Sequence, residues 1–109
     1  MLATSIVIHG LPDALSALET SPRATLRSAP GAAGFAGALW WRELIALARA
    51  QTGWQGAAYV DCGSNGALAV EAIRCDVVHL ILDRDCPNFQ DISELAVASG
   101  GEVHGRECA

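Results

Sequence analysis

The chain has 109 residues and a formal net charge of −5, and 51% of its side chains are apolar while 17% are charged. This length favours one α/β domain over residues 1–109, with enough core to fold without a disulfide or a metal. The basic residues are scattered arginines and there is no lysine, which argues against binding to nucleic acid and excludes a lysine Schiff base or a P-loop lysine.

No apolar run reaches the roughly 18 residues that a membrane span requires. The first eight residues lack the basic start and the longer apolar segment of a signal peptide. We therefore expect a cytoplasmic protein that binds no membrane and keeps its four cysteines reduced.

The N-terminal half alternates strands with helical patterns. An apolar run predicts a first strand over 6–8, and a proline followed by an acid then starts a helix that extends to residue 18. Residues 24–28 predict a second strand. The glycine- and alanine-rich segment 30–37 predicts a loop, followed by the strongest helix over 38–51, which ends near a glycine.

The C-terminal half continues the alternation. It predicts a third strand over 57–61, a helix to residue 75 capped at 64 or 65, and a fourth strand over the apolar run 77–83. Pro87 opens a last helix to residue 98, and residues 102–104 predict a short fifth strand. Such regular alternation predicts a parallel sheet with crossover helices.

Strand composition predicts the order of the strands. The first and fourth strands are nearly continuous apolar runs, as expected for strands covered on both faces. The second strand alternates and the fifth is very short, as expected at edges. We therefore expect a three-layer sandwich with the flavodoxin-like order 2-1-3-4-5. The alternative is half of a (βα)8 barrel that a second chain completes.

Candidate catalytic residues follow the strands, because ligands of open parallel sheets bind beyond the carboxyl ends of the strands. In the expected order His9 lies beside Asp61 and Cys62, and could act as a general base. Cys86 precedes a helix, where the helix dipole favours a thiolate. The alternative is that these are solvent-facing strand ends and ordinary free cysteines.

A possible anion site is the loop containing Gly31, Gly34 and Gly37, with Ser28 before it, because the loop precedes the N-terminus of a helix. Its spacing is neither that of a dinucleotide-binding fingerprint nor that of a P-loop, so tight packing on the sheet is the alternative. No CxxC or HxxxH spacing is present, and we predict no metal site and no cofactor.

The helix over 38–51 carries the clearest surface signal. Trp40 and Leu44 mark its central apolar stripe, and Trp41 with Ile45 widens the stripe beyond what one sheet covers. Trp41 and Ile45 are therefore expected either against a neighbouring helix or in the interface of a homodimer.

Four features together carry a resemblance: the loop over 30–37, Trp40-Trp41-Arg42, Asp61-Cys62 and Cys86-Pro87. In them the chain resembles a set of small uncharacterised proteobacterial proteins, from Ser28 to Pro87. The resemblance supports the α/β fold and implies no activity.

Two functions follow from these observations. The first is a non-catalytic domain, not an enzyme, that acts by self-association as a homodimer or by binding a protein partner. The alternative is a small enzyme or a protein that binds a small anionic ligand at the carboxyl ends of the strands.

Overall fold

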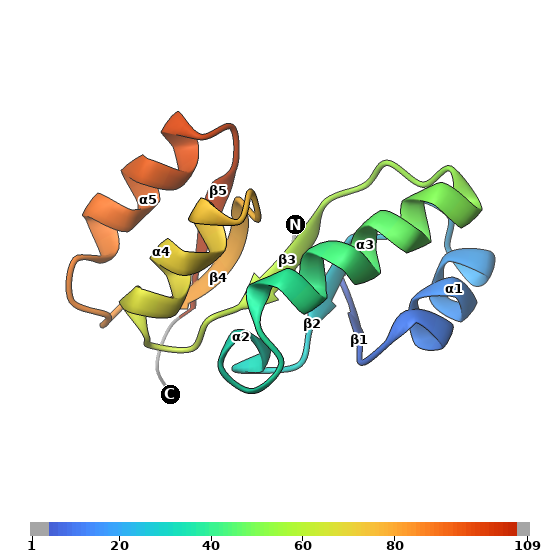
Figure 1. Ribbon diagram of the computed structural model, residues 1–109, viewed down its shortest axis with the longest axis horizontal. Coiled ribbons are helices and arrows are strands. Elements are labelled where there is room, and N and C mark those ends of the chain that lie inside the picture. Colours follow the sequence, from blue (N-terminus) through green and yellow to red (C-terminus); the bar gives the residue numbers. More distant parts are fainter. Residues whose placement is uncertain (1–4, 107–109) are drawn as a thin grey trace.

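The computed structural model describes residues 5–106, which form a five-stranded sheet and its connecting helices (Figure 1). The strands are β1 (Ile6–Ile8), β2 (Leu26–Ser28), β3 (Ala58–Asp61), β4 (His79–Asp83) and β5 (Glu102–Arg106). The helices are α1 (Leu11–Thr20), α2 (Ala32–Phe35), α3 (Ala38–Thr52), α4 (Gly66–Arg74) and α5 (Phe89–Ala98). In this part of the chain no helix is long and apolar enough to cross a bilayer.

The sheet is entirely parallel, and its strands lie in the order β1-β2-β3-β4-β5. The α/β class and the five-stranded parallel sheet are thus confirmed. The predicted order 2-1-3-4-5 is wrong: β1 lies at one edge and β2 lies inside, while β5 lies at the other edge as expected. Consecutive order is the order expected from the alternative, half of a (βα)8 barrel.

Over residues 5–106 the helices cover one face of the sheet, so the chain forms two layers rather than the three expected. Strands that advance in one direction with right-handed crossovers place every helix on the same side. The main core accordingly joins Leu26, Val60 and Leu80 to apolar side chains of α1, α3, α4 and α5. The opposite face contains only a small cluster around Tyr59 and Ile81.

The strand register shows which residues share the helix-free face. Residues that lie side by side on neighbouring strands form three rows across this face. The first row contains Val7, Arg27, Tyr59, His79 and Glu102. Toward the carboxyl ends of the strands follow a row of Asp61, Ile81 and His104 and a row of Asp83 and Arg106. Most of these side chains are polar or ionisable. The arginine in β2 thus marks the uncovered face of the sheet and not an edge of it.

Several element boundaries differ from the prediction: α1 ends two residues later than expected, and β2 and β4 each begin two residues later. The segment expected as a loop contains the short helix α2, and β5 extends two residues past His104 to Arg106. Helix α5 begins at Phe89, after a cap at Asn88, and not at Pro87. The expected cap of α4 is Asn65, whose side chain accepts hydrogen bonds from the backbone of Ala67 and Leu68.

Of the two positions expected for Trp41 and Ile45, the homodimer interface is wrong and packing against neighbouring helices is confirmed, because the structure places both in the core. They are 1% and 7% exposed, because α1 and α4 pack against the two sides of α3 and cover its wide apolar arc. The outer surface of α3 instead carries Leu39 and Leu47, which are about half exposed. Trp41 and Ile45 therefore offer no surface to a second chain.

Candidate functional site

The observed strand order separates two of the candidate catalytic residues. Strand β2 lies between β1, which precedes His9, and β3, which ends at Asp61. His9 instead contacts Asp13: its backbone N–H donates to Oδ2 at 2.9 Å, and its Nδ1 lies 3.4 Å from the same oxygen. The predicted pairing of His9 with Asp61 is therefore wrong.

Cys62 and Cys86 are both buried, at 2% and 4% exposure. Burial, together with the nearby Asp61 and Cys86, raises the pKa of the Cys62 thiol to about 12. Burial and Asp85 likewise raise the pKa of Cys86, whose Sγ lies 3.2 Å from the Pro87 carbonyl oxygen. Both thiols are thus protonated at neutral pH, which disfavours a role as nucleophile.

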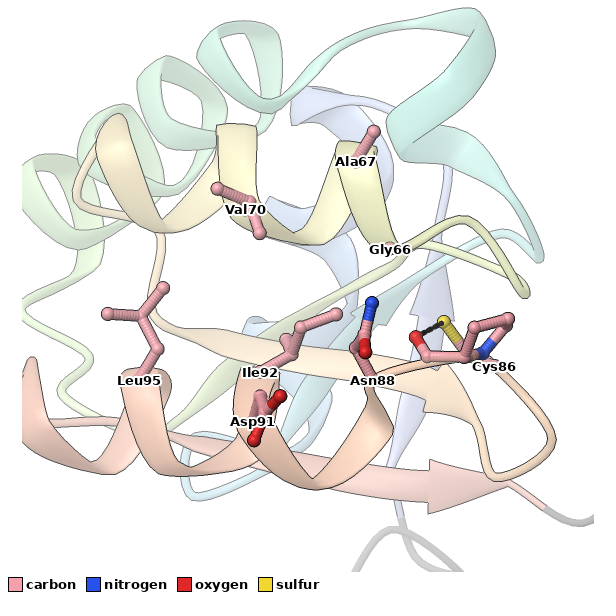
Figure 2. Close-up of a pocket in the computed structure, with 9 residues that line it drawn as sticks. Gly66, Ala67, Val70, Cys86, Asn88, Asp91, Ile92 and Leu95 are labelled. Carbon is pink, nitrogen blue, oxygen red and sulfur yellow. Dashed lines mark hydrogen bonds between the residues drawn. The ribbon is translucent and has the colours of Figure 1, made fainter.

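An open groove of about 580 Å³ lies between α4 and α5, beside the turn that follows β4 (Figure 2). Val70, Ile92 and Leu95 supply apolar walls, while Asn88 and Asp91 supply polar groups. The helices approach closely at Gly66, where a Cβ would lie 3.0 Å from Cδ1 of Ile92. The groove, although open to solvent, therefore ends at Gly66. Its lining consists mostly of small or apolar side chains, with a carboxylate at Asp91.

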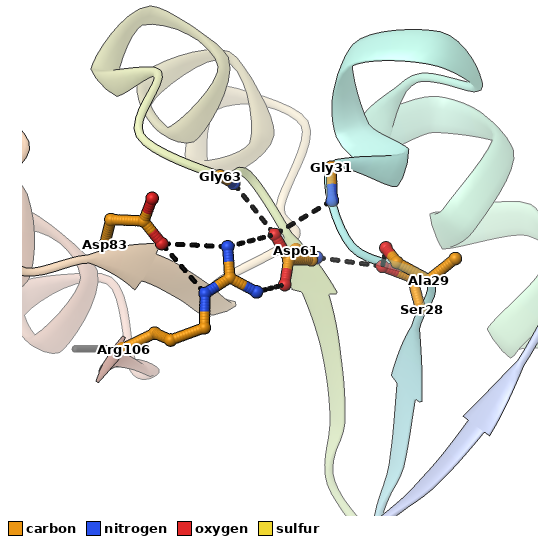
Figure 3. A network of polar contacts seen from close by, with 7 residues as sticks. All are labelled: Ser28, Ala29, Gly31, Asp61, Gly63, Asp83 and Arg106. Carbon is orange, nitrogen blue, oxygen red and sulfur yellow. Dashed lines mark hydrogen bonds and ion pairs between the residues drawn. The ribbon is translucent and has the colours of Figure 1, made fainter. Parts of the chain in front are cut away.

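Asp61 is the centre of a polar network at the carboxyl edge of the sheet (Figure 3). Its carboxylate is buried, and Oδ1 accepts the backbone N–H of Gly31 at 3.0 Å and that of Gly63 at 2.8 Å. Both glycines have positive φ, 70° and 62°, a conformation that other residues rarely adopt. The Asp61 backbone N–H in turn donates to Oγ of Ser28 at 2.9 Å.

Arg106 completes this network from β5. Its Nε donates to Oδ1 of Asp83 at 2.8 Å, and its Nη1 and Nη2 donate to the two oxygens of Asp61. Nη2 also lies 2.8 Å from Oδ1 of Asp83. Burial lowers the pKa of Arg106, but the hydrogen bonds to Asp83 and Asp61 outweigh this effect and raise it. Since a guanidinium has only five N–H donors, the two carboxylates use most of them.

The glycine-rich segment contacts an anion at one residue: Gly31 donates its backbone N–H to the carboxylate of Asp61. Gly31 and Ser28 contact Asp61, whereas Gly34 packs on α4 and Gly37 precedes α3. The four candidate ligand-binding residues therefore do not form one site. Gly31 binds the Asp61 carboxylate, and Ser28 accepts the Asp61 backbone N–H.

Two residues of the helix-free face were not among the predicted site residues. Arg106 lies beyond the predicted end of the fifth strand, and Tyr59 lies inside the third. The Tyr59 hydroxyl donates to Glu102, and its ring meets His79 edge-on with centroids 5.4 Å apart. Burial and Glu102 raise the pKa of Tyr59, so the phenol stays protonated and donates. The alternation of polar residues at 102, 104 and 106 is the sequence signal for this longer strand.

Across residues 5–106 no group of three or more His, Cys, Asp or Glu side chains is arranged to hold a metal ion. The acidic side chains nearest to such an arrangement, Asp61 and Asp83, already share the Arg106 guanidinium.

Comparison with known proteins found no matching family model, no matching curated protein and no matching solved structure. Membership of the set of small proteobacterial proteins stays a prediction.

Proposed function

We propose that this chain is a non-catalytic α/β domain that acts by self-association, as a homodimer. One contrast supports the proposal: the polar groups at the carboxyl edge bond to one another, whereas large apolar side chains on the helices are exposed. A site for chemistry needs reactive groups that substrate can reach, and an interface needs apolar surface that a partner can cover.

The first half of the contrast concerns the residues that could do chemistry. Asp61 and Arg106 neutralise each other, and their hydrogen-bonding atoms are occupied. The thiols of Cys62 and Cys86 are buried and protonated. His9 lies apart from them beside Asp13. These residues support folding rather than catalysis.

The second half concerns the helix layer. Its most exposed large apolar side chains are Phe35 at 74% and Val97 at 64%, and Leu39, Leu47 and Leu95 are about half exposed. Covering such surface stabilises an assembly by on the order of 25 cal/mol for each Å² removed from water. A closed two-fold dimer is the commonest way for one chain to cover its own surface.

Sedimentation equilibrium tests the proposal. Between micromolar and near-millimolar concentration, we expect the mass to rise from that of one chain, 11.3 kDa, to twice that value. A mass of one chain at the highest concentration contradicts self-association.

The groove between α4 and α5 favours a second candidate, a site for a small ligand. Its apolar walls and the Asp91 carboxylate match an aromatic amine better than the anionic ligand considered from the sequence. Tryptamine is a suitable probe: NMR titration should shift the methyl signals of Val70, Ile92 and Leu95. Asp91→Asn should weaken these shifts, and their absence in the wild type would exclude this candidate.

A cytoplasmic location is part of the proposal. It is supported by Cys62, Cys75 and Cys86, which are free thiols in the described part of the chain, as is usual in a reducing compartment. Membership of the proteobacterial set is likewise proposed, supported by the sequence features that run from Ser28 to Pro87.

A further inference from the structure

Strand β5 is an edge strand, and some of its backbone N–H and C=O groups point away from its neighbour β4. Within residues 5–106 no strand pairs with its outer side. The N–H of Glu102 bonds to the carbonyl of Val78, and the carbonyl of Arg106 accepts from Arg84. Because hydrogen-bonding direction alternates along a parallel strand, the N–H and C=O groups of Val103 and Gly105 point away from β4.

We propose that β5 pairs antiparallel with β5 of a second copy, about a two-fold axis at His104. This inference rests on the proposed self-association and names its surface. Val103 of each chain then lies opposite Gly105 of the other, and these residues exchange hydrogen bonds in both directions. The N–H and C=O groups of Val103 and Gly105, four in each strand, are then all hydrogen-bonded. Left unpaired, such groups on an edge strand are available for pairing with another chain.

The number of paired backbone groups supports this register over its neighbour. With the axis at His104, Val103 and Gly105 of each strand both lie within the paired region. An axis at Val103 would instead leave Gly105 beyond the paired region. The pairing depends on the backbone and not on charge, because Arg106 already bonds to Asp61 and Asp83, and Glu102 accepts the Tyr59 hydroxyl.

Helix α5 provides apolar surface on the same side. Asp91 and Leu95 line the groove toward α4, and at 100° per residue Phe89, Ser93 and Val97 lie on the opposite flank. The position of this flank is fixed by Arg84, whose guanidinium lies 5.7 Å from the Phe89 ring centroid. A Cβ on Gly105 would come within 2.7 Å of Cζ of the same arginine, so the flank lies beside β5.

A second copy would cover what this flank leaves open. Val97 is 64% exposed. Pairing of the β5 strands brings the two α5 helices together above the joined sheet. It would remove the apolar surface of Val97 from water.

Cysteine crosslinking tests the register. In a background where Cys75 and Cys108 are replaced by serine, His104→Cys places two thiols at a non-hydrogen-bonded antiparallel pair, with Cα atoms about 4.5 Å apart. That spacing lies within the range of a disulfide. We expect mild oxidation to convert most of this variant to a covalent dimer.

Glu102→Cys is the matched control on the same face of the same strand. The two substituted positions would be offset by four residues, roughly 13 Å along the strands, which is too far for a disulfide. We expect crosslinking at least about tenfold slower than at 104. Equal crosslinking of both variants would overturn the proposed register.

Sedimentation separates this inference from the proposed function. If the wild type is a dimer but His104→Cys does not crosslink, the β5 interface is wrong and self-association stands. If the wild type is monomeric, both the proposed self-association and the β5 interface are wrong. Val97→Glu keeps the test independent of the cysteines: it should shift the protein to monomer, whereas Leu39→Glu should not. A dimer lost with Leu39→Glu and retained with Val97→Glu would place the interface on α3.

Discussion

Asp61 connects three segments that are distant in sequence. Its carboxylate accepts hydrogen bonds from Gly31 after β2, from Gly63 after β3 and from Arg106 in β5. A carboxylate can be buried when donors and an opposite charge surround it, as they do here. Asp61 therefore holds the carboxyl edge of the sheet together, and its replacement should lower the free energy of unfolding.

Asp61→Asn should lower the free energy of unfolding by about 3 kcal/mol, because it leaves the Arg106 guanidinium with half of its countercharge and turns an amide donor toward other donors. Urea unfolding measures this loss. Glu71→Gln, an exposed acid on α4, is the control and should change stability by less than about 0.5 kcal/mol. Equal stability of the two variants would show that the Asp61 network is dispensable.

Cys62 should make stability depend on pH in the alkaline range. Its pKa is about 12 in the folded chain against an ordinary 9.0, so above the lower value the unfolded chain releases a proton that the folded chain retains. The free energy of unfolding therefore falls as pH rises.

Urea unfolding at about pH 8 and about pH 10 should show a decline that is larger in the wild type than in Cys62→Ala by roughly 1 kcal/mol. Tyr59 and Cys86 contribute to the decline with the same sign in both proteins and cancel in the comparison. Identical declines would show that the Cys62 thiol titrates at its ordinary pKa.

At the scale of elements, most strands and helices could be predicted from hydrophobic period and turn residues, but the strand order could not. The second strand alternates Leu26, Arg27 and Ser28, which looks like an edge if both faces of the sheet are covered. In a sheet covered on one face, an interior strand alternates in the same way. The apolar run of β4 is equally ambiguous, since Ile81 is buried on the helix-free face beside Tyr59.

Helix α4 depends on its cap at Asn65. The Asn65 side chain satisfies two backbone N–H groups of the first turn, at 3.0 and 3.2 Å. Asn65→Ala should cost about 1 kcal/mol, and Asn65→Asp should cost little because aspartate caps as well. Thermal unfolding of the three proteins measures the difference. If alanine is as stable as aspartate at this position, the cap contributes nothing.

At the scale of the whole molecule, the candidate site was predicted in part. Asp61, Ser28 and Gly31 do meet at the carboxyl edge, because parallel strands end on the same side. Arg106, the partner of Asp61, comes from β5, two strands further along the chain, and lies beyond the predicted end of that strand. Which donors reach a buried carboxylate depends on strand order, and the order was the part that local sequence could not specify.

The same strand order leaves β1 and β5 as the edges of the described sheet, and we propose that in solution a second copy covers β5. Hydrogen exchange of the Val103 and Gly105 amides, followed by NMR at high and low protein concentration, tests this most directly. Both N–H groups point to the outer edge, so we predict slow exchange at high concentration and fast exchange after dilution or in Val97→Glu. Fast exchange of both amides at every concentration, as for N–H groups open to water, would contradict the pairing of β5 with a second copy.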